Sequence, residues 1–268
     1  MRFPLRPANA LPALLLLVFV ALLLTGCETD TPQNTFDARG EVARTQRDLF
    51  YLAMWPAIVV MVLVMGVLVI ELLRFRRRSP DELPKQVHGN TRLEIVWTII
   101  PAVLLLGLGV PMVAAIYDIG REPSKDAYPI IVTGIQWRWQ FEYPEILDAN
   151  GDPVSDFDEV HIPAGREIAF TIRAEDVIHS FWVPKLGGKL DAIPGRENRM
   201  WLKADEPGSF SGQCVELCGT GHAEMKLVLI ALSQEDFDAW EQEMRAGNQA
   251  AETGGSAGAV SSVGAGGR

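Results

Sequence analysis

Two cysteines, a histidine and a methionine lie within twelve residues of one another in the segment Gly212–Met225. Thiolate, imidazole and thioether groups are soft ligands suited to copper, as in sites with a long axial methionine. A mononuclear blue-copper centre uses a single cysteine. Because Cys218 follows Cys214 by four residues, two thiolates could bridge two metal ions, with one histidine terminal to each ion.

The second terminal histidine must come from another part of the chain, which has four histidines. His88 lies in a loop between two apolar segments, and His161 lies in the run Val-His-Ile-Pro. His179 follows the apolar pair Val-Ile. We predict His179 as the remote ligand, because that ligand must approach from a neighbouring strand or loop.

Two other uses of the cysteines remain open. In an oxidising compartment Cys214 and Cys218 could form a disulfide. A zinc site of two cysteines and two histidines is also possible, but it would leave Met225 without a role. A covalent haem c is excluded, because the chain has no Cys-x-x-Cys-His motif.

The segments that must position these ligands have the pattern of β-strands. Apolar and polar residues alternate strictly over residues 135–143, which predicts one strand whose aromatic face includes Trp137 and Trp139. Many short strands separated by Gly, Pro and Asp clusters indicate a sandwich or barrel. Further strands are predicted at residues 168–172, 177–183, 198–203 and 225–232.

A helix is predicted to follow the last strand. Ser233 is a suitable N-cap, and one apolar stripe follows it, made of Phe237, Trp240 and Met244. We predict an exported domain over residues 118–247. The Gly/Ala/Ser-rich residues 248–268 are predicted to be a disordered tail.

The first 26 residues have the features of an export signal. An apolar stretch of 14 residues, Leu11–Leu24, follows two arginines and is too short to span a bilayer. The residues before Cys27 resemble the lipobox of a bacterial lipoprotein, which would make Cys27 the lipidated first residue of the mature chain. An uncleaved anchor with an incidental cysteine is the alternative.

Two longer apolar segments predict a transmembrane hairpin, with helices at residues 49–73 and 95–117. An exported segment, residues 27–48, would precede it. The connecting residues 74–94 are rich in basic side chains, which the positive-inside rule places in the cytoplasm. Both outer ends of the hairpin then face the side to which the export signal delivers Cys27.

The exported domain is acidic, with 12 Lys and Arg against 24 Asp and Glu over residues 118–247. The chain as a whole has a formal net charge of −10, which argues against nucleic-acid binding. A negative field of this size favours association with a cationic partner. Ordinary solubility is the alternative explanation of the charge.

The chain resembles the subunit 2 family of bacterial cytochrome c oxidases over roughly residues 45–245. The run Gly212–Met225 matches the CuA signature of that family, and Asp176–Pro184 resembles its upstream ligand strand. Asp191–Arg196 resembles the stretch between them. The resemblance implies a two-helix transmembrane hairpin followed by an all-β cupredoxin-type sandwich and a C-terminal helix.

The resemblance also implies the ligands of a dinuclear copper centre. Met225 would be a weak axial ligand of one copper, and the backbone carbonyl of Glu216 a ligand of the other. The Glu216 side chain would reach a magnesium ion shared with subunit 1. The remaining ligands would be the bridging thiolates of Cys214 and Cys218 and the terminal imidazoles of His179 and His222.

Two further residues match positions of the family outside the copper site. Trp137 matches the tryptophan through which electrons enter, although Arg138 stands where the family commonly has a tyrosine. A core aromatic is the alternative for Trp137, since strand alternation places it on the same face as Trp139. Glu94 matches the carboxylate at the mouth of the K proton pathway, and a simple helix N-terminal charge is its alternative.

The resemblance therefore implies a subunit of a proton-pumping oxidoreductase. It would accept electrons from cytochrome c and pass them to haem in subunit 1, for reduction of oxygen to water, in a complex that includes subunit 3. We expect the bacterial inner membrane, with the copper domain on the periplasmic side, and cytochrome docking at Glu142, Glu175 and Asp176. A CuA subunit of a nitric oxide reductase and a membrane-anchored copper-delivery protein are the alternatives, and a quinol oxidase subunit is disfavoured because it would not need these ligands.

Overall fold

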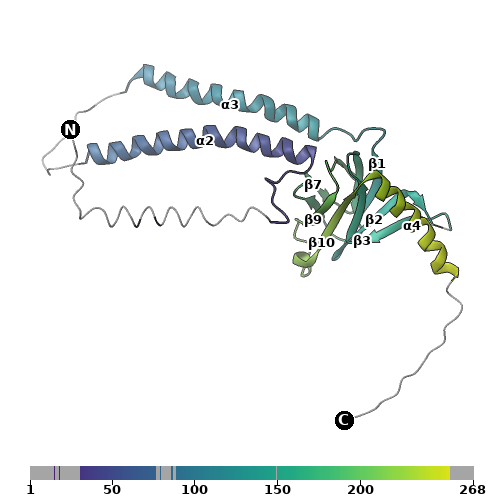
Figure 1. Cartoon of the computed structure of the whole chain (residues 1–268). Helices are drawn as coiled ribbons and strands as arrows, with labels where there is room; N and C mark the ends of the chain where they lie inside the picture. The colour runs from purple at the N-terminus through teal and green to yellow at the C-terminus, as the bar shows by residue number, and fades with distance from the viewer. Residues whose placement is uncertain are drawn as a thin grey trace, which may run out of the picture.

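The computed structural model describes residues 31–76, 79, 86, 89–148 and 150–253, together with Leu15 and Val18. Two long helices lie side by side and lead into a β-sandwich that carries a further helix (Figure 1). Most of the predicted signal peptide, Cys27, residues 77–78, 80–85 and 87–88 of the predicted cytoplasmic loop, and residues 254–268 fall outside the described residues.

The two predicted membrane spans are helices α2 (Glu41–Arg74) and α3 (Thr91–Ile119). Both are long and apolar enough to cross a membrane, and their apolar side chains are exposed almost throughout. The side-chain oxygen of Asn90 accepts hydrogen bonds from the backbone N–H groups of Arg92 and Leu93, which caps the start of α3.

Helix α2 begins at Glu41, eight residues before the apolar run from which the span was predicted. Val42 and Ala43 are buried against the sandwich, and the N–H of Ala43 donates to the carbonyl of Leu186. This packing extends the helix beyond the apolar run. Hydropathy alone reports the part of a helix that lies in lipid and misses a turn that packs on protein.

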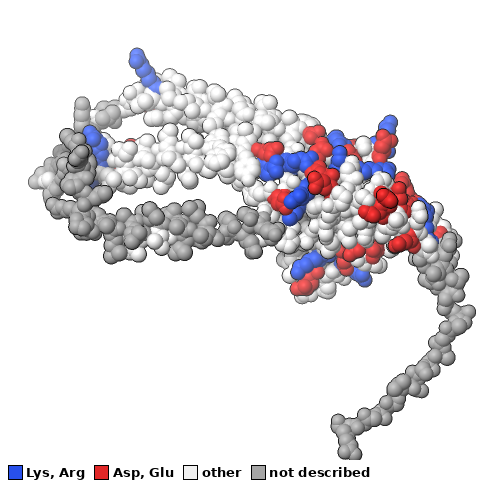
Figure 2. Space-filling model, viewed as in Figure 1, with Lys and Arg blue, Asp and Glu red and all other residues white. Residues whose placement is uncertain are grey.

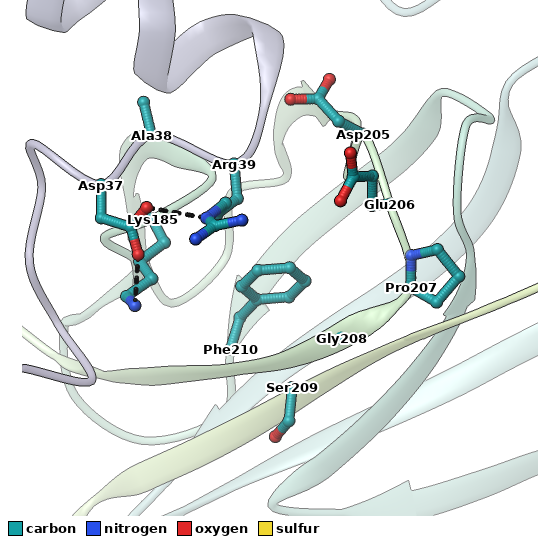
Figure 3. A pocket seen from close by; sticks show the side chains of 10 residues that line it. All are labelled: Asp37, Ala38, Arg39, Lys185, Asp205, Glu206, Pro207, Gly208, Ser209 and Phe210. Atoms are coloured by element: carbon teal, nitrogen blue, oxygen red, sulfur yellow. Dashed lines mark hydrogen bonds and ion pairs between the residues drawn. The ribbon is translucent and has the colours of Figure 1, made fainter. Parts of the chain in front are cut away.

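The residues before α2 are bound to the sandwich. The carboxylate of Asp37 lies 2.7 Å from Nζ of Lys185 and 2.7 Å from Nε of Arg39 (Figure 3). These hydrogen bonds, the one from Lys185 first, hold the pKa of Asp37 below its usual value. A cavity of about 410 Å³ lies between this segment and the strand that starts at Gly208.

The sandwich consists of two five-stranded sheets. β1 (Tyr128–Ile135) pairs in parallel with β5 (Ile168–Ala174), and β10 (Lys226–Leu232) pairs in parallel with β4 (Glu159–Pro163). The first sheet has the order β3 (Pro153–Phe157), β2 (Arg138–Leu147), β1 (Tyr128–Ile135), β5 (Ile168–Ala174) and β8 (Asn198–Leu202). The second has the order β4 (Glu159–Pro163), β10 (Lys226–Leu232), β9 (Gly208–Cys214), β6 (His179–Val183) and β7 (Gly187–Ala192).

The core lies between the two sheets and confirms the predicted aromatic face of β2. Trp139, Phe141 and Tyr143 are fully buried, and the rings of Trp139 and Phe141 contact Phe181 of the opposite sheet. Burial of such large apolar side chains is the main favourable contribution to the stability of the domain.

The single strand predicted over residues 135–143 is wrong at its start. Ile135 ends β1 and lies opposite Arg138, the first residue of β2, so that Gln136 and Trp137 form a two-residue hairpin turn. Apolar and polar residues alternate across this turn as they do along a strand, although the chain reverses its direction there. As a result Trp137 leaves the buried face and is 39% exposed.

Helix α4 (Gln234–Thr253) starts as predicted. The hydroxyl of Ser233 accepts a hydrogen bond from the N–H of Asp236 at 3.1 Å, and Phe237 is buried against Tyr128. The helix continues past Gly247 to Thr253. A single glycine costs about 1 kcal/mol inside a helix, and Gln249-Ala-Ala-Glu beyond it favour helix.

Charged side chains lie mainly on the sandwich, with acidic and basic groups interspersed (Figure 2). The helices α2 and α3 are almost free of them along their length in this view. The structure thus has the expected fold: a two-helix hairpin, a cupredoxin-type β-sandwich and a C-terminal helix.

Candidate metal centre

The predicted ligands meet at one end of the second sheet. His179 is the first residue of β6, and Cys214 is the last residue of β9, which pairs with β6 through Phe181. The loop after Cys214 is held to β6 by a hydrogen bond from the N–H of Val215 to the carbonyl of Ser180. This pairing brings together residues that are far apart in the sequence.

The loop then returns to the sheet through a short 3-10 helix, η2 (His222–Glu224). The N–H of His222 donates to the carbonyl of Gly219, and the N–H of Cys214 donates to the carbonyl of Met225. Both ends of the ligand loop are therefore anchored by backbone hydrogen bonds. The side chains of Cys218, His222 and Met225 face the same interior space as Cys214.

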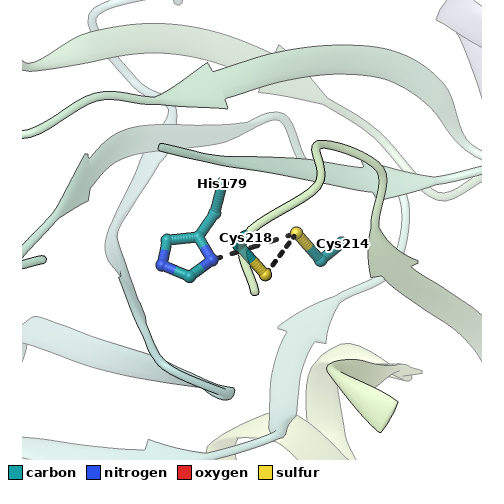
Figure 4. Close-up of side chains that lie close together, drawn as sticks. All are labelled: His179, Cys214 and Cys218. Atoms are coloured by element: carbon teal, nitrogen blue, oxygen red, sulfur yellow. Dashed lines mark hydrogen bonds between the residues drawn. The ribbon is translucent and has the colours of Figure 1, made fainter. Parts of the chain in front are cut away.

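The two sulfur atoms lie 3.8 Å apart, and each has its own imidazole. Sγ of Cys214 lies 3.9 Å from Nδ1 of His179, and Sγ of Cys218 lies 3.7 Å from Nδ1 of His222. Figure 4 shows His179 and the two cysteines pointing toward one another. These three offer ligand atoms that all lie within 4.8 Å of one another.

Two weaker donors complete the set. Sδ of Met225 lies 3.8 Å from Sγ of Cys218, and the carbonyl oxygen of Glu216 lies 3.2 Å from Sγ of Cys214. Each sulfur atom is therefore flanked by one imidazole nitrogen and one further donor. All six predicted donors occupy one small volume.

The donor set fits copper. The site is buried, with His179 and Met225 at 1% exposure or less. Both cysteines of the described residues are free, so the structure does not contain the disulfide considered above. A zinc site of two cysteines and two histidines would give the buried thioether of Met225 no role, whereas a weak axial methionine is typical of copper.

Burial also controls the ionisation of the thiols. Desolvation, together with the neighbouring Cys214, raises the pKa of Cys218 to about 11. Two adjacent thiolates would repel each other in this apolar space, and a bound cation removes that cost. A metal ion that binds here must therefore displace the proton of Cys218.

The imidazole of His179 has a partner on its other side. Nε2 lies 2.8 Å from Oδ1 of Asp176, while Nδ1 faces Cys214. Burial raises the pKa of Asp176, but hydrogen bonds from His179 and from the backbone N–H groups of Gln136 and Val177 outweigh it, so this pKa lies below its usual value. The sequence prediction missed this role of Asp176, which the spacing of three residues before His179 could have suggested.

Trp137 lies beside the site and outside the core, so the core-aromatic alternative is wrong. Its Nε1 donates to the carbonyl of Cys218 at 3.3 Å. The core residue is Trp139, which is fully buried. Trp137 therefore lies with one side toward solvent and the other on the ligand loop.

The three predicted docking residues differ in their surroundings. Glu175 is exposed, and Glu142 lies 3.9 Å from Nη2 of Arg173. Asp176 is held against His179 and two backbone N–H groups. We therefore expect a charge reversal at Asp176 to disturb His179 as well as any docking surface.

Glu94 and Glu216 lie at separate places. Glu94 is in the first turn of α3, at the end of the hairpin remote from the sandwich (Figure 1). Glu216 is exposed in the ligand loop, next to Leu217, which is 79% exposed. The structure brings neither carboxylate into the copper site, although the backbone carbonyl of Glu216 belongs to it.

Comparison with known proteins identifies the family of both parts. A family model described as the periplasmic domain of cytochrome c oxidase subunit II matches residues 129–232. A second, described as the transmembrane domain of the same subunit, matches residues 28–114. Together they cover the helical hairpin and the sandwich.

Individual relatives agree with these matches. The chain is 43% identical over 236 residues to cytochrome c oxidase subunit 2 of Alkalihalophilus pseudofirmus, covering 86% of this chain and 67% of the relative. It is also 33% identical over 235 residues to quinol oxidase subunit 2 of Bacillus spizizenii, covering 85% and 70%. The solved periplasmic domain of subunit II of cytochrome oxidase from Bradyrhizobium japonicum is 34% identical, with 46% of this chain and 97% of that chain covered and a TM-score of 0.42. The chain therefore belongs to the cytochrome c oxidase subunit II family, as a membrane protein with an outside domain.

Proposed function

We propose that this chain is the electron-accepting subunit of a cytochrome c oxidase. It takes electrons from a cytochrome c at a dinuclear copper centre and passes them to haem in subunit 1, where oxygen is reduced to water. The observation that carries the proposal is the convergence of four further donors on two cysteine sulfur atoms 3.8 Å apart. When bound, the copper pair supplies a one-electron redox centre, which the protein positions and tunes.

The chain's own residues perform three tasks at this site. Cys214 and Cys218 hold the metals by their thiolates, and His179 and His222 supply Nδ1. The carbonyl of Glu216 and the thioether of Met225 complete the ligands. Because the pairing of β6 with β9 and the loop hydrogen bonds fix the segments that carry these groups, little rearrangement is needed when the oxidation state of the centre changes.

Burial of the two cysteines, His179 and Met225 limits the access of water to the site, while His222 is half-buried. Cys214 and Cys218 are each 4% exposed, and His179 is fully buried. This arrangement disfavours the copper-delivery alternative, because a delivery protein must release its metal through an open, exchangeable site. The exposed indole of Trp137 is the part of the site that a donor protein can contact directly.

Because some relatives are named quinol oxidase subunit 2, the ligand set is the feature that distinguishes a cytochrome donor from a quinol donor. A subunit that takes electrons from a quinol has no need for two thiolates, two imidazoles and a thioether in one buried space. The complete set in this chain favours a cytochrome donor. A nitric oxide reductase with the same copper site would differ only in the terminal reaction, and the named relatives favour the oxidase.

The finer assignments follow from the family and from position. We propose that the exposed Glu216 binds a magnesium ion shared with subunit 1, and that Glu94 lies at the mouth of a proton pathway on the cytoplasmic side. The location would be the bacterial inner membrane, with subunits 1 and 3 as partners. Lipidation of Cys27, which precedes Asp37 by ten residues in the sequence, would add a second membrane anchor.

Copper loading of the full chain in detergent tests the proposal. We expect two copper ions per chain, a purple colour, and one unpaired electron shared over both ions by electron paramagnetic resonance. Cys218→Ser should lose the shared spectrum, because one bridge cannot support the same electron sharing. One copper per chain, or a colourless zinc form as the only stable product, would contradict the dinuclear assignment.

A further inference from the structure

The hairpin turn between β1 and β2 contacts both ligand-bearing segments. Nε2 of Gln136 donates to the carbonyl of Cys218 at 2.6 Å, and the backbone N–H of Gln136 donates to Oδ2 of Asp176 at 2.7 Å. Asp176 in turn accepts from His179. One residue of the turn therefore links the loop that carries Cys218 to the segment that carries His179.

The carbonyl of Cys218 accepts two side-chain donors from this turn. The amide of Gln136 lies at 2.6 Å and the indole N–H of Trp137 at 3.3 Å. A carbonyl oxygen has two lone pairs, so both bonds can form together. The hydrogen bond from the Gln136 side-chain amide is the shorter of the two. It holds in place the Cys218 carbonyl that also accepts the indole N–H.

Two glycines of the ligand loop make room for the indole. A Cβ atom at Gly221 would lie 2.5 Å from Cδ2 of Trp137, and one at Gly219 would lie 3.2 Å from its Nε1. The φ and ψ of Gly221 are −91° and 8°, which other residues also adopt. Glycine is therefore required at residue 221 for space and not for backbone conformation.

We propose that Gln136 and Gly221 are positioning residues that form a seat for Trp137 on the ligand loop. Gln136 holds the carbonyl of Cys218 in place for the indole, and Gly221 lets the ring lie against the backbone. This inference rests on the proposed function for its consequence, namely that the seat sets the contact between the exposed indole and a copper ligand. The seat itself is made by contacts within the chain and can be tested without copper.

The first test removes the amide donor. Gln136→Met keeps the length of the side chain but cannot donate, and Gln140→Met on β2 is the matched control. The full chain, labelled with 5-fluorotryptophan, is examined metal-free by fluorine NMR, with the Trp137 resonance identified by its loss in Trp137→Phe. We expect this resonance to shift or split in Gln136→Met and to stay unchanged in Gln140→Met.

The second test fills the space under the ring. Gly221→Ala should displace the Trp137 resonance, whereas Gly208→Ala should not, because its Cβ would meet no atom closer than 3.4 Å. With copper bound, both seat variants should keep two ions per chain and show altered hyperfine splitting. Electron uptake from reduced cytochrome c should be slower by about tenfold or more, the range typical of partners that orient metal ligands.

The outcomes separate the two proposals. An unchanged Trp137 resonance in both Gln136→Met and Gly221→Ala overturns the seat, whatever the copper spectra show. If the unaltered chain fails to bind two copper ions while the resonance shifts as expected, the seat stands and the proposed function fails. If the resonance shifts but the uptake rate matches that of the controls, the seat has no role in electron transfer and that part of the inference is rejected.

Discussion

The carboxylate of Asp176 lies 2.8 Å from Nε2 of His179, the imidazole whose Nδ1 faces Cys214. For Nδ1 to bind a metal, the proton of the neutral ring must be on Nε2, where Asp176 accepts it. The carboxylate thus selects the tautomer that can bind and fixes the orientation of the ring. Asp176 has this task in addition to any role that its charge has at the surface.

Removal of this carboxylate should weaken copper binding. We expect Asp176→Ala to lower the copper affinity by about tenfold to a hundredfold, the range known for partners of metal-binding histidines. The measurement is a competition titration of the full chain against a chelator of known affinity. Glu175→Ala is the matched control, since that carboxylate is exposed, and an equal loss in both variants would argue against a specific role of Asp176.

Met225 should tune the site without holding it together. Its sulfur is buried 3.8 Å from Sγ of Cys218. Met225→Leu keeps the volume of the side chain and removes a weak ligand, so the colour and the two copper ions should remain while the midpoint potential shifts. A potentiometric titration followed by absorption checks this, and loss of one copper ion would show that the thioether is an essential ligand.

The end of α3 is fixed to the sandwich by a charged pair that should make stability depend on pH. Nη2 of Arg121 lies 2.8 Å from Oε2 of Glu167, and this hydrogen bond lowers the pKa of Glu167 below its ordinary value of 4.5. The stabilisation is present above the unfolded-state pKa, near 4.5, and is lost as the pH falls through the lower folded-state pKa.

Glu167→Gln should therefore destabilise the chain near neutral pH, by about 1 kcal/mol for a pair of which one partner is partly exposed. The difference from the unaltered chain should shrink as the pH is lowered below 4.5. Chemical denaturation of both chains in detergent at several pH values measures this difference in the free energy of unfolding. A difference that stays constant down to acid pH would mean that the loss comes from packing and not from the charge.

Sequence reasoning identified the residues that meet at the candidate metal centre because their types and spacing are local. Cys214, Cys218, His222 and Met225 lie on one loop, and only His179 had to be brought from another strand. The contacts that the sequence did not reveal are made across the fold. The turn at Gln136, for example, lies against Cys218 because two hairpins meet at one end of the sandwich.

The predicted and observed boundaries differ at the strand around Trp137 and at the start of α2, and both differences have a common physical origin. The alternation around Trp137 is the same for a straight strand and for a strand interrupted by a two-residue turn, so periodicity could not distinguish them. The early start of α2 depends on the burial of Val42 and Ala43 against the sandwich. In both cases tertiary contacts decide where an element begins.

The orientation of the hairpin is a prediction from the basic loop. Reporter fusions after Ser79 should be cytoplasmic and those after Lys125 exported, since six basic residues lie between Glu71 and Arg92. A pair of reporters, one active only inside and one only outside, measures both sites. An exported fusion at Ser79 would reverse the hairpin and remove the role proposed for Glu94.

Recruitment of the donor should depend on ionic strength if the acidity of residues 118–247 attracts a cationic cytochrome. The Debye length is only ~8 Å at 0.15 M salt, so association should slow as salt is added. Glu142 and Glu175 are the carboxylates to test, because Asp176 is engaged with His179. Glu175→Lys should lower the on-rate and flatten the salt dependence while the copper spectrum stays intact.

Trp137→Phe separates docking from electron transfer in the same experiment. The indole contributes its N–H bond to Cys218 and part of the exposed surface, but no charge. We therefore expect the salt dependence of association to remain while electron transfer within the complex becomes much slower, as measured by stopped-flow oxidation of the cytochrome. If salt has no effect on the rate in the unaltered chain, the acidity serves only solubility, and a donor held by apolar contact or by covalent fusion is the better explanation.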